Sequence, residues 1–418
     1  MAAYSGSTLR GSAGILNRMT IEADPATLDI LDPAFQVNSP ETREAARRCW
    51  YAQTPLGIAV LRHEDCLAIL KDRRLRQMGI DQLTVQGITS GTLFEMWRRF
   101  VFAMEGPGHG RLRRLLNPAF SPAAVNRLRP RMREIVHGLI DRFAADGACE
   151  FMSAFADHYP PHVMAELLGL PAEEHEQFVA WGKALASILS YEVPQKLAEI
   201  EAALHGLYAA IDRIADARRR EPRQDLITAL VHASDGDRDR LDPDELRANV
   251  AGLVLGGQDS TRGQLGLALE IFARHPEQWA RLAIEPELAE SATEEVMRAS
   301  SVIPIIWRVA DVDLEYRGTP IAAGTRLWLM LAAAHHEPAI YGDTGFDIQA
   351  DRPAQLSFGH GIHFCLGAQL ARVEMHEALP ILARRLPGLA LAGEPVRRPV
   401  LAGFVGPEHL PIRFTPAG

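Results

Sequence analysis

The stretch Phe358–Gly367, FGHGIHFCLG, places one cysteine among three glycines and two histidines. The other cysteines of the chain, Cys49, Cys66 and Cys149, lie far from Cys365 in the sequence and form no CxxC pair. The spacing therefore predicts neither a disulfide scaffold nor a structural zinc site. Any chemistry at Cys365 has to use a single sulfur.

A lone thiolate in this setting can be a metal ligand. The three glycines allow a turn tight enough to direct backbone N–H groups at the sulfur. Residues 365–386 have the pattern of an amphipathic helix, which places Cys365 at a helix N-terminus where an anion is favoured. A soft anionic ligand without companions suits iron held by a macrocycle. For the cysteine alone the alternatives stay open: it could be a small buried hydrophobe, and His360 and His363 could be loop residues or metal ligands.

Composition limits the classes of function. Of 418 residues, 47% are hydrophobic and 23% charged, which is typical of a soluble globular protein, and the formal charge of -9 argues against a nucleic-acid partner. The longest apolar run that we find, Leu327–Ala334, is too short to cross a membrane, and the first 19 residues lack the apolar block of a secretory signal. We expect a cytoplasmic protein with no membrane partner.

The periodicity predicts a mainly helical fold with small β-sheets. Apolar residues recur at helical spacing, and they predict helices at His63–Lys71, Gly108–Asn117, Ala123–Ala145, Ala172–Leu189, Pro194–Arg219 and Pro243–His275. Strand patterns occur at Gly57–Arg62, Val309–Tyr316, Thr325–Trp328 and Pro411–Phe414, too few for a large sheet. Residues 77–91 read as a polar loop that could cover a site. We expect residues 1–20 to be a flexible N-terminus and residues 21–418 to form one domain.

The helix predicted from Pro243 begins with Asp242 as N-cap and Glu245 three residues later, and it is long enough to cross the protein. Its centre, GGQDST at residues 256–261, puts two glycines, an acid and two hydroxyls inside an apolar element. Glycines there let a flat group approach the backbone, while the hydroxyls can replace a loosened helical hydrogen bond. A packing notch between crossing helices is the alternative, and this stretch alone does not decide between them.

Taken together, the motifs resemble those of the cytochrome P450 superfamily, and specifically its soluble bacterial members. The resemblance covers nearly the whole chain and rests on FxxGxxxCxG at 358–367, EEVMR at 294–298, GGQDS at 256–260 and HGRLRRLLNPAF at 109–120. It implies the cytochrome P450 fold, with heme b held between the long central helix and the cysteine loop. It also implies a heme-thiolate monooxygenase, an oxidoreductase in which Cys365 is the axial ligand of the iron.

The same resemblance assigns the other heme contacts. Phe358 would pack beside the sulfur, and Gly256 and Gly257 would let the long helix lie across the heme. The full set of cofactor-binding residues implied is His109, Arg113, Gly256, Gly257, Arg308, Phe358, His363, Cys365 and Gly367. Four of these would neutralise the two propionates, which otherwise would be buried anions: His109, Arg113, Arg308 and His363.

Two further sites are implied by the resemblance. Glu295 and Arg298 match the buried ion pair of the family, but Gly345 stands where an arginine is frequent, and Arg352 could substitute for it. Asp259 and Ser260 match the acid–alcohol pair that relays protons during oxygen activation. The usual alcohol is threonine, so serine here predicts leakier oxygen activation, and Thr261 is the reserve candidate.

Substrate contacts are implied only by the family topology. The apolar or aromatic side chains that we expect to face the substrate are Phe94, Trp97, Leu185, Ile303, Ile305, Ile306 and Phe404. Ordinary core packing is the alternative for each of them. The substrate expected is an apolar or aromatic-containing small organic molecule, hydroxylated or epoxidised with O2, and secondary metabolism is a candidate setting.

The expected electron donor is a separate ferredoxin with its reductase, because the chain has no stretch left for a flavin or iron–sulfur domain. Arg111, Arg114 and Arg372 would make a positive docking patch, or a solvated helix face. We expect a monomer. Two other functions stay open: a peroxide-driven or isomerase-type heme-thiolate enzyme, against which the acid–hydroxyl pair argues, and a non-catalytic heme sensor or docking module.

Overall fold

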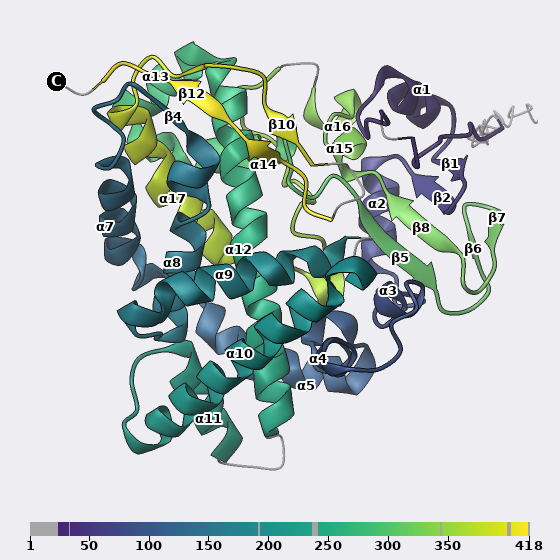
Figure 1. The fold of residues 1–418 in the computed structure, drawn as a ribbon. Coiled ribbons are helices and arrows are strands. Elements are labelled where there is room, and N and C mark those ends of the chain that lie inside the picture. The colour runs from purple at the N-terminus through teal and green to yellow at the C-terminus, as the bar shows by residue number, and fades with distance from the viewer. Residues whose placement is uncertain are drawn as a thin grey trace, which may run out of the picture.

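The computed structural model describes residues 24–32, 34–190, 193–235, 241–342, 345–398 and 403–416. The N-terminus that was expected to be flexible, residues 1–20, lies outside the described residues. Most of the described chain is helical. A five-stranded sheet lies on one side of the helices, and the long helix α12 (Pro243–Ala273) runs through the middle of the helical part (Figure 1).

The elements are as follows. The other helices are α1 (Pro40–Arg48), α2 (His63–Lys71), α3 (Asp81–Thr84), α4 (Thr92–Arg99), α5 (Gly106–Leu116), α6 (Pro122–Asn126), α7 (Arg129–Ile140), α8 (Tyr159–Leu168), α9 (His175–Leu185), α10 (Val193–Arg220), α11 (Leu226–Asp235), α13 (Pro276–Ile284), α14 (Ala289–Ala299), α15 (Leu331–Ala334), α16 (Pro338–Tyr341) and α17 (Ala368–Arg385). The strands are β1 (Tyr51–Thr54), β2 (Gly57–Val60), β3 (Leu75–Arg76), β4 (Ala148–Glu150), β5 (Ile306–Ala310), β6 (Leu314–Tyr316), β7 (Thr319–Ile321), β8 (Arg326–Leu329), β9 (Ala390–Leu391), β10 (Val396–Arg397), β11 (Pro407–His409) and β12 (Pro411–Arg413).

The mainly helical prediction is confirmed, and several boundaries are corrected. The helix expected over Ala123–Ala145 is divided into α6 and α7, because Pro130 in the first turn of α7 lacks an N–H and restricts the residue before it. The helix expected over Ala172–Leu189 is α9 flanked by single 3-10 turns. The loop expected at residues 77–91 contains the short helix α3.

The expectation of small β-sheets is confirmed, although five short strands join in one sheet. The main sheet has the order β1-β2-β8-β5-β3, with β2 and β8 parallel and the other neighbours antiparallel. Strands β1 and β3 have four and two residues, too short for alternation to be readable in the sequence. The strand expected over Val309–Tyr316 is divided between β5 and β6, with β6 paired to β7 in a separate hairpin.

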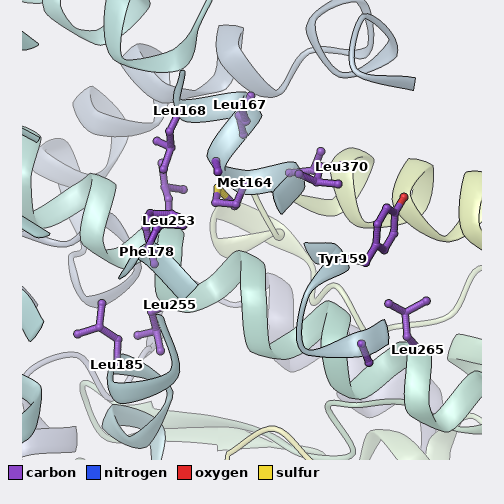
Figure 2. Close-up of a cluster of buried hydrophobic side chains, with 14 of the residues drawn as sticks. Tyr159, Met164, Leu167, Leu168, Phe178, Leu185, Leu253, Leu255, Leu265 and Leu370 are labelled. Carbon is purple, nitrogen blue, oxygen red and sulfur yellow. The ribbon is translucent and has the colours of Figure 1, made fainter. Parts of the chain in front are cut away.

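The core has one large helical part and two smaller parts on the faces of the sheet. Along β2, Ile58 and Val60 pack on one face while Ala59 and Leu61 pack on the other, as the two-residue period of a strand requires. In the helical part, Leu253, Leu255 and Leu265 of α12 lie in one cluster with side chains of α8, α9 and α17 (Figure 2). Helix α12 is therefore buried along most of its length and has a fixed position.

The start of α12 agrees with the sequence pattern. Asp242 accepts a hydrogen bond from the N–H of Glu245, and Glu245 reaches back to the N–H of Asp242, which is a complete capping box with Pro243 in the first turn. The helix then continues without interruption through residues 256–261 to Ala273.

A buried ion-pair network joins α14 to the segment before the cysteine loop. Arg298 and Glu295 pair through two contacts of 2.7 Å, and Arg298 also donates to the carbonyl of His335 at 3.0 Å. Arg352 Nε lies 3.0 Å from Glu295 Oε2, and its Nη2 donates to the carbonyl of Gly345 at 2.9 Å. Arg352 therefore supplies the second cation of Glu295 at the place where Gly345 has no side chain to do so.

Replacing Arg298 by methionine should lower the free energy of unfolding by about 3 kcal/mol, because it leaves the Glu295 carboxylate buried with one partner fewer. The matched control is Arg219→Met in α10, whose partner Asp216 is also three residues away but lies at the surface with 62% of its side chain exposed. That control should change the free energy by less than about 1 kcal/mol. Urea denaturation followed by tryptophan fluorescence measures both, and equal effects would contradict a buried structural role.

Candidate heme and substrate site

A cavity of about 300 Å³ lies between the central turns of α12 and the cysteine loop. A single water needs only a small fraction of this space, so the cavity is no packing defect. Its wall combines an apolar set with a cationic set. Helix α12 contributes Gly256, Ser260 and Thr261, and the cysteine loop contributes Phe358 and Cys365. Segments more than 100 residues apart in the sequence therefore form one site.

Glycine makes the cysteine loop possible. Gly359 and Gly361 have φ values of 67° and 73°, in the left-handed region that favours glycine. A Cβ on Gly361 would lie 2.6 Å from the carbonyl oxygen of Leu70, so the loop packs directly against the end of α2. The N–H of Cys365 donates to the carbonyl of Phe358 at 2.9 Å, and α17 begins three residues later at Ala368. These contacts present the sulfur to the cavity.

The thiol of Cys365 is accessible from the cavity and enclosed by protein elsewhere. This burial raises the pKa of the thiol, while the N–H of Gly367 and the charges of Arg113 and Arg372 act in the opposite direction. The guanidinium of Arg372 lies 4.4 Å from the centre of the Phe358 ring and pairs with Glu294 at 2.6 Å. The sulfur thus has one backbone donor and two cations near it, as a ligand thiolate requires.

Four cationic or hydrogen-bonding side chains gather at the same cavity. The rings of His109 and His363 lie 4.6 Å apart, and His363 contacts Glu105 at 2.9 Å. Arg113 donates to the carbonyl of Phe364 at 2.9 Å, and Arg308, only 2% exposed, donates to the carbonyl of its neighbour Trp307. All four predicted propionate-binding residues are therefore brought together.

The charges of the two arginines are not balanced by protein. Across the described ranges of the chain, no carboxylate lies within ion-pair distance of Arg113 or Arg308. Burial lowers the pKa of Arg308 to about 10, and burial with the charges of His363 and Arg113 lowers the pKa of His109 to about 4. Arg308 is buried, Arg113 is half-buried, and neither contacts a carboxylate directly, so the site can hold an anionic ligand. Heme b fits, because it carries two propionates and offers an iron that accepts one thiolate.

The two glycines of α12 have different surroundings. A Cβ on Gly256 would meet no atom within 4 Å, so this position opens onto the cavity. A Cβ on Gly257 would lie 2.1 Å from Cε of Met164, so Gly257 mainly lets α8 pack closely against α12. Gly257 thus fits the packing notch, while the approach of a flat group to Gly256 stays a prediction for which the structure leaves space.

The three polar residues that follow have separate partners. Ser260 donates from its hydroxyl to the carbonyl of Gly256 at 2.6 Å, within the intact helix. Thr261 donates to the carboxylate of Glu374 in α17 at 3.2 Å. Asp259, 7% exposed, pairs with Arg398 from the C-terminal segment at 2.5 Å and is absent from the cavity wall. No direct hydrogen bond joins Asp259 to Ser260 in the described chain.

Five of the seven side chains expected to face the substrate line the cavity: Trp97, Ile303, Ile305, Ile306 and Phe404. Leu185 does not, because it is fully buried in the core at the end of α9 (Figure 2). Phe94 does not either, because it lies beside the buried stripe of α4 and packs partly exposed against the core. Neither residue lies at the wall of this cavity.

The sequence reasoning missed other wall residues, including Phe100, Phe102, Met164 and Glu374. The aromatic ones follow Trp97 directly, but their helix ends at Arg99 and no periodic pattern covers them. The sequence did contain a signal for Glu374. It falls on the apolar stripe of α17 four residues after Leu370, where a carboxylate is unexpected.

Among the described residues, none of the helices combines the length and the apolar character needed to span a bilayer.

Replacing Gly361 by alanine should reduce the amount of heme retained per polypeptide, because the new Cβ would meet the Leu70 carbonyl oxygen and displace the cysteine loop. Gly318→Ala is the matched control, since Gly318 has a similar φ of 77° but no atom within 4 Å of a Cβ. Both changes cost about 1–2 kcal/mol of backbone strain. Heme retention measured by absorbance after gel filtration should fall only for Gly361→Ala; equal retention would contradict the packing argument.

Comparison with known proteins agrees with this geometry. The family model "Cytochrome P450" matches residues 174–386. The chain is 36% identical over 400 residues to the luteothin monooxygenase of Streptomyces thioluteus, covering 94% of this chain and 97% of the relative. It is 34% identical to the mycinamicin IV hydroxylase/epoxidase of Micromonospora griseorubida, with coverage of 94% and 96%. The crystal structure of CalO2 superposes with a TM-score of 0.84 at 29% identity, over 92% of this chain and all of the other. The chain therefore belongs to the cytochrome P450 family, as a heme-thiolate monooxygenase with heme b as cofactor.

Proposed function

We propose that this monooxygenase hydroxylates or epoxidises an apolar or aromatic-containing small organic molecule, using O2 and electrons from a separate ferredoxin. Heme b bound to Cys365 supplies the oxygen-activating chemistry. The observation that carries the substrate class is the apolar wall of the cavity, which the chain builds from three separate segments. Such a wall takes up a ligand by displacing water from apolar surface and leaves few polar groups to fix its orientation.

The first part of this wall follows α14. The N–H of Val302 donates to Oε1 of Gln264 at 3.0 Å, which ties the segment to α12. Ile303, Ile305 and Ile306 then pass along the cavity. The N–H of Val405 donates to the carbonyl of Val302 at 2.9 Å, so the C-terminal segment bearing Phe404 is attached to the same strip. Backbone hydrogen bonds thus hold apolar side chains at the wall.

The second part is aromatic. Trp97, Phe100 and Phe102 line the cavity, and their ring centres lie about 6 Å from one another. The indole N–H of Trp97 donates to the carbonyl of Gly79 at 2.8 Å, which fixes the ring and leaves it no donor for the substrate. This cluster favours a substrate with flat or aliphatic surface over one rich in hydroxyls.

The names of relatives support the same class. Besides the luteothin and mycinamicin IV enzymes, a solved relative at 26% identity and a TM-score of 0.80 is the epothilone D-bound cytochrome P450epoK. We propose secondary metabolism as the setting of this enzyme.

For proton supply we propose that the Ser260 hydroxyl serves the cavity, with Asp259 as the acid behind it. Ser260 lines the cavity, and Asp259 precedes it directly in α12. Because Asp259 is held by Arg398, it has to leave that partner or work through water to reach the hydroxyl. Serine lacks the methyl group that restricts the threonine rotamer, so its hydroxyl can turn from the Gly256 carbonyl toward the cavity.

The positive patch predicted from the sequence needs correction. Arg111 pairs with Glu245, and Arg372 pairs with Glu294, so two of its three charges are balanced by carboxylates. The outer side of the cysteine loop offers a better surface. On this surface Ile362 is 44% exposed, and His360 is exposed near Lys71. Partial desolvation lowers the pKa of His360, and the positive charge of Lys71 lowers it further. The positive charge of Lys71 and the apolar side chain of Ile362 suit an acidic ferredoxin.

Titration of the ferric protein with a library of apolar and aromatic compounds should reveal ligands through the spin-state change that occurs when water leaves the iron. Ile303→Phe should weaken the best ligand about ten-fold by filling the cavity. Ile284→Phe is the matched control, because Ile284 is 79% exposed and should leave affinity unchanged.

Turnover then tests the reaction. With ferredoxin, reductase and NAD(P)H, the ligands found should stimulate oxygen uptake and give a product heavier by one oxygen atom. Product formed with peroxide but not with the ferredoxin system would favour a peroxide-driven enzyme. Binding without any turnover would favour a heme sensor or docking module, and both outcomes would contradict our proposal.

A further inference from the structure

Gln77 is a buried polar side chain on the cavity wall that belongs to none of the sequence motifs. It lies directly after β3 and is only 6% exposed. Its backbone is fully bonded, since the N–H donates to Glu105 Oε1 at 2.8 Å and the carbonyl accepts from Arg76 at 3.0 Å. In the parts of the chain that are described, neither end of its side-chain amide has a hydrogen-bond partner. A buried amide left open at a cavity needs an explanation.

The pairing of β3 with β5 places Gln77 beside Arg308. In this antiparallel pair, Arg76 lies opposite Val309. Continuing the register by one residue brings Gln77 opposite Arg308. Residues that lie opposite each other in antiparallel strands project from the same face, with Cβ atoms about 5 Å apart. Because both side chains also line the cavity, the amide of Gln77 and the guanidinium of Arg308 reach the same part of its wall.

Glu105 shows that this part of the wall is the cationic one. Its Oε1 accepts the N–H of Gln77 at 2.8 Å and lies 2.9 Å from Nε2 of His363. Burial lowers the pKa of Arg308 to about 10, and the charge of Glu105 acts in the opposite direction, so the two groups are close enough to interact. Gln77 thus borders His363 and Arg308, two of the residues expected to bind the propionates.

The chemistry of a propionate leaves a place for a neutral donor. Arg113 and Arg308 supply two positive charges, which equal the charge of two ionised propionates. Each carboxylate, however, offers two oxygens with about four acceptor sites, so it can take further donors besides a cation. A side-chain amide supplies two N–H donors and adds no charge. Since neither end of the Gln77 amide is held by protein, the group can turn its nitrogen toward an anion in the cavity.

We propose that Gln77 binds the cofactor by donating a side-chain N–H to the propionate that Arg308 also holds. This contact is additional to those of His109, Arg113, Arg308 and His363, and Gln77 lies outside the motifs that assigned those four residues. A hydrogen bond to an anionic acceptor is stronger than one to a neutral acceptor, so it should slow the loss of heme. The inference concerns the cofactor and does not depend on the proposed substrate or electron donor.

Resonance Raman spectroscopy of the ferric holoprotein tests this contact, because the bending mode of a heme propionate shifts when a hydrogen bond is lost. Gln77→Leu removes the amide and should move the band to lower frequency. Gln77→Glu keeps the shape, but a carboxylate cannot donate and competes with the propionate for Arg308, so it should move the band too. This second variant keeps the test valid if the first does not fold. Gln82→Leu is the matched control, because Gln82 is 4% exposed but lies away from the cavity wall.

Transfer of heme to an excess of apomyoglobin, followed by absorbance, measures the effect on binding. Gln77→Leu should lose heme about ten-fold faster than the wild type, as expected for a lost hydrogen bond to a charged acceptor. Gln77→Glu should lose it faster still, and Gln82→Leu should match the wild type. A propionate band unmoved in both Gln77 variants, an equal shift in Gln82→Leu, or unchanged heme loss in both Gln77 variants would overturn the inference. Neither measurement uses substrate or reductant, so this failure is distinguishable from failure of the proposed function.

Discussion

The structure depends on holding one sulfur atom at the wall of a large cavity. The backbone before Cys365 turns in the left-handed region at Gly359 and Gly361, and the second of these lies against the carbonyl oxygen of Leu70 with no space for a side chain. The loop can therefore occupy only the position that α2 and α17 leave for it. This rigidity matters because a ligand that already has its bound geometry loses little entropy when it binds a metal.

The second constraint is the balance of buried charge. Where a partner exists within the chain, it is used: Glu295 has Arg298 and Arg352, and Glu377 has Arg129 and Arg133. At the cavity, two ionisable groups of the described chain lack a direct partner of opposite charge. Arg308 contacts no carboxylate, and Glu374 contacts no cation. The propionates of heme b would balance the first, and burial raises the pKa of the second. These incomplete balances lie at the wall of the cavity, where a functional site is expected.

The sequence predicted those features that are local or belong to a motif. The ten-residue motif of the cysteine loop, the capping box at Asp242 and the pair Glu295–Arg298 are each recognisable from residues within a few positions of one another. Contacts between distant segments could not be predicted in this way. Arg398 pairs with Asp259, which lies 139 residues away in the sequence. Leu185 packs into the core, although it was expected to face the substrate. Gly257 is a further example of such a distant contact, because a side chain at this position would collide with Met164 on another helix.

The most direct test of this account is the absorption spectrum of the reduced protein after treatment with carbon monoxide. If the Cys365 sulfur is the ligand of the heme iron, the Soret band should move to the long wavelength characteristic of thiolate ligation. Cys365→Ala should remove that band. A wild-type protein without the band, or a Cys365→Ala variant with an unchanged spectrum, would contradict the assignment on which the interpretation of the cavity and its cations depends.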